Sequence, residues 1–155
     1  MKIERKVFLY MFVFGIIYRI HHFLTSLIPR WAISLDLSSS DMMTIIMFLN
    51  QVSYAIRWGL LFIVLIVMYY GGKKLDLKAN LKSIVISMLV GGFIGCFLVG
   101  SVYMPLFFRI TQHKIGLDLT VDYLVGNLYT SLETTSFLFF ASLTAVAISH
   151  LRKNV

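Results

Sequence analysis

The sequence predicts an all-α fold, a bundle of four transmembrane helices that forms a single domain over residues 1–155. The first observation is composition: 59% of the residues are hydrophobic, 14% are charged, and the mean hydropathy is +0.85. A soluble chain of this size has too little interior to bury so much apolar surface. The second observation is that the apolar residues form four runs, each long enough to supply the roughly 20 residues of a membrane-spanning helix.

The first two expected helices cover Val7–Ile28 and Met42–Tyr70. The first follows the basic start MKIERK. Because this run is too long for a signal peptide, contains Arg19 and lacks a small-residue cleavage site, we expect an uncleaved helix. The segment SSSD (38–41) offers N-cap hydroxyls and an acidic group to the second helix. A pair of glycines at 71–72 follows it, as is common at a helix C-terminus.

The third and fourth expected helices cover Ile84–Phe108 and Tyr123–Ser149. Asn80 precedes the third helix and is expected to cap it. Pro105 lies near the end of that helix and is expected to kink or terminate it, because proline lacks a backbone N–H. The residues before the fourth helix are suited to turns and caps: Asp118, Thr120 and Asp122.

Lysines and arginines are divided unequally between the two expected sides of the membrane. Nine of the 14 lie on the side of both termini, three lie on the other side, and Arg19 and Arg57 fall within helices. The positive-inside rule then predicts a multi-pass protein of the cell membrane with cytoplasmic termini. The same arrangement accounts for the net charge of +7, so we expect no nucleic-acid partner. A single cysteine, Cys96, and the lack of a targeting peptide favour a prokaryotic plasma membrane.

Three charged residues on three helices are expected at a similar depth: Arg19, Arg57 and Glu133. At 1.5 Å per residue, Glu133 lies roughly 16 Å along its helix from Asp122, and Arg57 lies roughly 24 Å from Lys73. An isolated charge that faces lipid costs about 3 kcal/mol or more. We therefore expect Glu133 to lie against Arg57, Arg19 or both.

Each of these charges shares a helix face with polar or small residues, and we expect such faces to point into the bundle or into a wet cavity. The faces are Gly15, Arg19, His22 and Ser26 in the first helix, Asn50, Tyr54 and Arg57 in the second, and Asp122, Gly126, Tyr129, Thr130 and Glu133 in the fourth. Further hydrogen bonds are expected from Asn50, Gln51, Tyr54, Asn127 and Tyr129.

This intramembrane cluster has two interpretations. It is either a buried polar network that determines which helices are neighbours, or a site that binds an anion, a lipid headgroup or a proton. Two arginines beside one glutamate leave about one surplus positive charge when all three are ionised. That surplus needs an anionic partner unless Arg19 extends to the outer surface.

Small residues recur along the third expected helix and predict that another helix packs closely against it. They are Ser87, Gly91, Gly95 and Gly100. The partner helix belongs either to the same chain or to another one.

Catalytic and metal-binding patterns are not found in the sequence. No pair among the four histidines has the i, i+4 spacing of a helical metal site. The segment GGFIG (91–95) lies inside an apolar run, so it is a packing motif and not a phosphate-binding loop. We expect no metal, no cofactor and no enzymatic activity.

The leading functional prediction is an accessory or structural subunit of a membrane complex, or a homo-oligomer. Its partners would be the lipid bilayer and other membrane subunits or copies of itself. The alternative is a small transporter or channel for an anionic solute or protons, which would use the intramembrane cluster. A membrane enzyme that acts on lipid is a third interpretation, but it lacks a nucleophile or metal set. The basic segment 71–82 is a topology signal that can also contact anionic lipid headgroups.

Overall fold

The structure, a computed structural model, describes residues 3–33, 38–74, 77–103 and 121–152. Over these residues it is all-helical, and four helices are long and apolar enough to cross a membrane. The predictions of an all-α chain and of four helices long and apolar enough to span a membrane are confirmed for the described residues. The candidate spans run over Arg5–Thr25, Ser39–Gly72, Asn80–Val102 and Leu124–Leu151.

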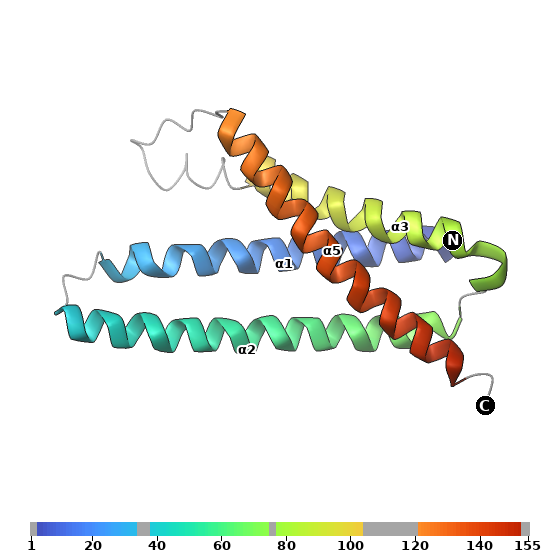
Figure 1. The fold of residues 1–155 in the computed structure, drawn as a ribbon, viewed down its shortest axis with the longest axis horizontal. Coiled ribbons are helices and arrows are strands. Elements are labelled where there is room, and N and C mark those ends of the chain that lie inside the picture. Colours follow the sequence, from blue (N-terminus) through green and yellow to red (C-terminus); the bar gives the residue numbers. More distant parts are fainter. Residues whose placement is uncertain (1–2, 34–37, 75–76, 104–120, 153–155) are drawn as a thin grey trace.

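The helices extend beyond the apolar runs that predict them. The bounds are α1 Ile3–Ile33, α2 Ser39–Gly72, α3 Leu77–Leu98 and α5 Val121–Leu151, and α3 continues into a π-helical turn, η1, over Val99–Tyr103 (Figure 1). Hydropathy marks only the part of a helix that matches the hydrocarbon layer, while polar residues at either end still complete helical turns. Several predictions lie outside the described residues: the third helix at 104–108, the Pro105 kink, and the roles of Asp118 and Thr120. The same holds for the side chains of Ser26 and Asp122.

The ends of α2 follow the local signals in the sequence. Ser38 is the N-cap, and its hydroxyl accepts a hydrogen bond from the backbone N–H of Asp41 at 3.3 Å. The helix ends at Gly72, so the predicted start and stop signals are both confirmed. The prediction that Asn80 caps the third helix is wrong. Because α3 already begins at Leu77, Asn80 lies within its first turn.

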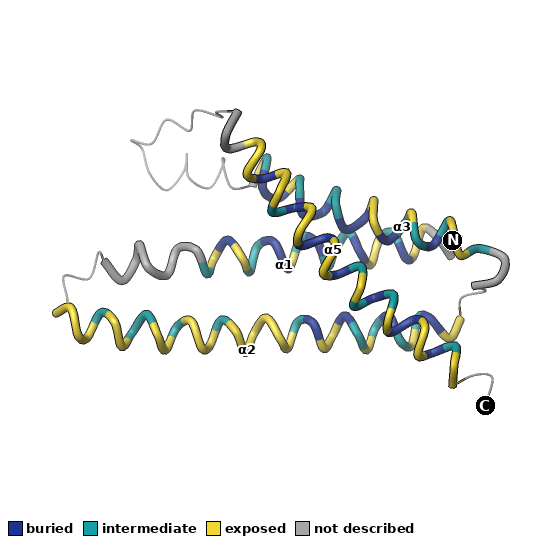
Figure 2. Tube along the Cα trace, viewed as in Figure 1, coloured by how far each residue is buried: buried dark blue, intermediate teal, exposed yellow. Residues whose placement is uncertain are grey.

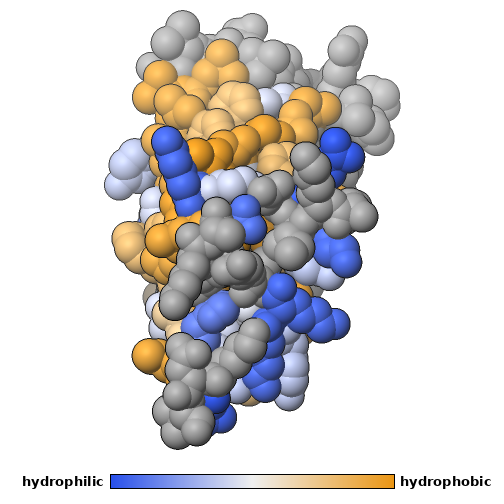
Figure 3. Space-filling model, turned by 90° about the vertical axis from the view of Figure 1, so that its right-hand side faces the viewer, coloured by the Kyte–Doolittle hydropathy of each residue, from blue (hydrophilic) through white to orange (hydrophobic). Residues whose placement is uncertain are grey.

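The helices form a bundle in which α1 and α2 run side by side and α5 crosses them obliquely (Figure 1). The most extensive packing joins α1 to α3, followed by α2 to α5 and α3 to α5. The start of α1, the end of α5 and the connection between α2 and α3 lie at one end of the bundle (Figure 1). The view onto this end shows hydrophilic residues over its middle and lower parts and hydrophobic residues above them (Figure 3).

Glycines let the backbones of α1 and α3 touch. A Cβ atom on Gly91 would lie 2.6 Å from the carbonyl oxygen of Phe8, and one on Gly95 would overlap the carbonyl of Phe12. From the other side, a Cβ atom on Gly15 would lie 2.6 Å from the carbonyl oxygen of Gly92. The glycines of the predicted packing ridge therefore meet a helix of the same chain.

The hydrophobic core occupies the half of the bundle that holds the termini (Figure 2). The buried residues of α2 all lie in its C-terminal half: Leu61, Val64, Met68 and Gly72. Between Ser39 and Leu60 no residue of α2 is buried. The two ends of the bundle therefore differ, with one packed half and one open half.

Candidate functional site

A polar cavity of about 290 Å³ lies between α1 and α2 in the open half of the bundle. Every residue that lines it carries a side chain able to form hydrogen bonds: Tyr18, His21, His22, Thr25, Asn50, Ser53, Tyr54 and Arg57. Polar groups along a membrane-spanning helix are expensive unless they face a cavity or one another. An all-polar lining within two candidate spans therefore makes this cavity the leading candidate site.

Arg57 lines this cavity and is held in place by aromatic side chains. Its Nε donates a hydrogen bond of 2.8 Å to the hydroxyl of Tyr18. Its guanidinium carbon lies 5.7 Å from the ring centroid of Tyr18 and 5.5 Å from that of Phe137, which are cation–π distances. Arg57 remains exposed despite these contacts. Its charge is thus fixed in position while part of the guanidinium stays accessible.

A second cavity of about 210 Å³ adjoins the first and shares Tyr18, Tyr54 and Arg57 with it. Its other lining residues are Trp58, Leu61 and Phe137. The lining therefore changes from polar to aromatic and apolar on passing Arg57. This combination suits a small ligand with an anionic group and an apolar part.

Arg19 takes part in a separate, buried network. It is 5% exposed, and its Nη2 donates a hydrogen bond of 2.8 Å to Oδ1 of Asn127. The Nδ2 of Asn127 donates to the hydroxyl of Ser101 at 2.9 Å and to the carbonyl of Phe97 at 3.5 Å. A side chain at Gly100 would overlap the Asn127 amide, so this glycine makes room for it. The network joins α1, α5 and the end of α3.

The π-helical turn η1 lies at this network. Ser101, an acceptor for Asn127, belongs to η1 (Val99–Tyr103). Single π-helical turns redirect the backbone groups of one helical turn and are frequent at functional positions. No local signal in the sequence predicts this turn, because its composition is that of an ordinary apolar helix.

Glu133 belongs to the face of α5 that the sequence predicts to point into the bundle or into a wet cavity. It is exposed on α5, as are Gly126 and Tyr129 of the same predicted face. Arg19 donates a hydrogen bond to Asn127, and Arg57 donates one to Tyr18. The described residues of this face are exposed or half-buried in the single chain, and its orientation towards a bundle interior or a wet cavity stays a prediction. Arg19, Arg57 and Glu133 are nonetheless all close enough to His22 to act on it electrostatically.

The face of α5 that does point into the bundle carries small hydroxyl residues. Ser131, Thr135, Ser142 and Ser149 are all buried there. They permit close approach in the same way as glycine. A Cβ atom on Gly92 would lie 3.3 Å from Thr135, and the hydroxyl of Ser142 lies 3.2 Å from the sulfur of Met11. Extending the small-residue rule from glycine to serine and threonine would have revealed this face in the sequence.

The remaining residues of the predicted cluster and packing ridge do not come together at one site. Asn50 and Tyr54 line the polar cavity with His22. Tyr129 is 70% exposed, and Thr130 donates a hydrogen bond to the carbonyl of Gly126 in its own helix. Ser87 on α3 is half-buried. In the part of the chain that the structure describes, no three His, Cys, Asp or Glu side chains come together to hold a metal ion.

Comparison of the chain with protein-family models, curated proteins and solved structures found no match. Any function must therefore be argued from the residues themselves.

Proposed function

We propose that this chain is a non-catalytic, multi-pass protein of the cell membrane that works as a subunit of an assembly. Two copies would associate through the face that carries Arg57 and Glu133. The observation that supports this is the exposure of both side chains within candidate membrane spans. The excess of lysine and arginine on the side of the termini supports cytoplasmic termini.

Both charges lie far from the nearer ends of their candidate spans, Ser39–Gly72 and Leu124–Leu151. Arg57 is 15 residues from Gly72, or roughly 22 Å, and Glu133 is nine residues from Leu124, or roughly 14 Å. A charge that faces lipid at such a depth costs about 3 kcal/mol or more. A partner that supplies the opposite charge removes most of this cost.

Arg57 and Glu133 also lie on the same side of the molecule. Phe137 follows Glu133 by one helical turn and therefore shares its face of α5. The same Phe137 ring lies 5.5 Å from the guanidinium carbon of Arg57.

A second copy fits this face by symmetry. A two-fold axis along the membrane normal keeps every residue at its own depth, and the same patch then meets itself. Arg57 of each copy would meet Glu133 of the other, so one contact would form twice. The unburied half of α2 would supply apolar area beside these pairs through Met43, Met47, Phe48 and Val52.

Charge exchange between chains tests this proposal. Arg57→Glu and Glu133→Arg should each weaken self-association, because each places like charges opposite one another. Mixing the two variants should restore association, since each chain then supplies the charge that the other lacks. Energy transfer between differently labelled chains in lipid vesicles measures this directly.

The same experiment contains its control. With both substitutions in one chain, association should also be restored, because the double variant is complementary to itself. Restoration by the double variant without restoration by the mixture would mean that Arg57 and Glu133 pair within a single chain. That outcome would overturn the proposed interface.

The polar cavity favours a second candidate function, the binding or passage of a small anionic solute. Arg57 is the cation in a lining that otherwise consists of neutral hydrogen-bonding groups and two histidines. In this case Arg57→Gln would abolish anion flux into proteoliposomes while leaving the oligomeric state unchanged. The assembly proposal expects the opposite pattern.

A further inference from the structure

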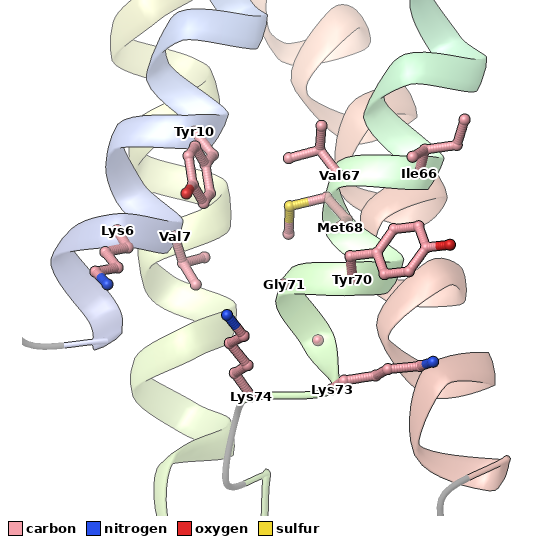
Figure 4. A pocket seen from close by; sticks show the side chains of 11 residues that line it. Lys6, Val7, Tyr10, Ile66, Val67, Met68, Tyr70, Gly71, Lys73 and Lys74 are labelled. Carbon is pink, nitrogen blue, oxygen red and sulfur yellow. The ribbon is translucent and has the colours of Figure 1, made fainter.

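A further cavity lies at the other end of the α1–α2 pair and has a different chemistry. Its volume is about 580 Å³, and it lies between the start of α1 and the end of α2. Figure 4 shows its apolar wall and its basic mouth. The wall includes Val7, Ile66, Val67 and Met68, with Tyr10 and Tyr70 beside them.

Three lysines line the mouth, but they do not have equal roles. In Figure 4 the amine of Lys74 points towards Val7, and Lys6 extends from α1 at a similar level. Lys73 extends away from the cavity, and its Nζ lies 4.9 Å from the ring centroid of Tyr69 and 5.5 Å from that of Tyr70. Lys74 is therefore the lysine that points towards the apolar wall, and Lys6 lines the cavity from α1.

The position of this cavity matches the boundary of the candidate spans. The α1 span begins at Arg5 and the α2 span ends at Gly72, so the lysines lie at the span ends and the apolar wall lies inside. None of the described residues that line the cavity is acidic. Lysines at this level attract anionic lipid headgroups, and their aliphatic stems can pack on apolar surface.

We propose that this cavity binds one anionic phospholipid of the leaflet next to the termini. Its phosphate would lie between Lys6 and Lys74, and an acyl chain would lie along Val7, Val67 and Met68. An inorganic phosphate would satisfy the lysines but leave the apolar wall unused. This inference does not depend on the proposed self-association.

Native mass spectrometry of the full chain released from mixed bilayers of phosphatidylglycerol and phosphatidylcholine tests the proposal. We expect one phosphatidylglycerol per chain to be retained in preference to phosphatidylcholine. Replacing both Lys6 and Lys74 by alanine should remove most of this preference, about fivefold for each lysine. Equal retention of the two lipids by the unmodified chain would overturn the proposal.

Lys73→Ala is the matched control, because it removes the same charge at the neighbouring position. It should retain most of the preference, since this amine points away from the cavity. If Lys73→Ala and Lys74→Ala reduce the preference for phosphatidylglycerol equally, diffuse surface charge attracts the lipid. That result would refute a specific lipid site in the cavity.

Gly71→Leu tests the apolar wall without changing any charge. Gly71 lines the cavity, and a Cβ atom there would meet no atom within 4 Å, so a leucine should enter open space and displace the acyl chain. We expect retention of phosphatidylglycerol to fall while all lysines remain. Added inorganic phosphate should not displace the lipid. Displacement by phosphate, or full retention in Gly71→Leu, would identify a simple anion site in place of a lipid site.

Discussion

At Arg19 and Arg57 the chain holds a cation within a candidate span in two different ways. Arg19 is buried and donates to the side-chain oxygen of Asn127. Arg57 is exposed, donates to Tyr18 and lies against two aromatic rings. A buried cation depends on each of its hydrogen bonds, because water cannot replace a lost partner. The two arginines should therefore respond differently when a neighbouring amide is removed.

Asn127→Ala should destabilise the fold by about 2 to 3 kcal/mol, the usual range for losing a buried hydrogen bond to a charged group. The substitution also removes the link from α5 to Ser101. Asn50→Ala is the matched control. Asn50 is exposed in the polar cavity, so this substitution should change the free energy of unfolding only slightly. Unfolding in mixed detergent, followed by circular dichroism, measures both. Equal effects of the two substitutions would show that the Arg19–Asn127 bond does not stabilise the bundle.

At the scale of the helices, two kinds of small residue allow neighbouring helices to pack closely: glycines, and serines or threonines. Gly91 and Gly95 bring α3 against the backbone of α1. On α5, buried hydroxyl residues such as Ser142 and Ser149 serve the same purpose. Without a hydrophobic driving force between helices in lipid, such contacts supply much of the association energy.

Gly95→Ala should destabilise the bundle by about 1 to 3 kcal/mol, the cost of overpacking a close contact. The added Cβ atom would overlap the carbonyl of Phe12 and force α1 and α3 apart. Gly59→Ala makes the same chemical change on α2, where a Cβ atom meets nothing within 4 Å. It should be neutral or slightly stabilising, because alanine has the higher helix propensity. If both variants unfold alike, α1 and α3 are not in backbone contact.

For the whole molecule, features that depend on local sequence were predictable and features that depend on helix pairing were not. The four helices follow from hydropathy, and the ends of α2 follow from Ser38 and the glycine pair at 71–72. Glu133 is exposed in the single chain, because the face of α5 that packs inside carries small hydroxyl residues and apolar residues instead. The pairing of Asn127 with Arg19 joins residues 108 positions apart, and no local pattern encodes such a distance.

The location of both termini at one end of the bundle gives the last prediction, which concerns topology in the cell. The single cysteine, Cys96, is fully buried, so a cysteine introduced at an exposed site can be labelled selectively. Ser40→Cys at the start of α2 should react with a membrane-impermeant thiol reagent in intact cells. Arg152→Cys, after the end of α5, should react only after the membrane is permeabilised, because the lysine-rich side is retained in the cytoplasm. Labelling of both sites in intact cells would contradict the odd number of membrane crossings, by α2, α3 and α5, that separates them. The reverse pattern would place the termini outside.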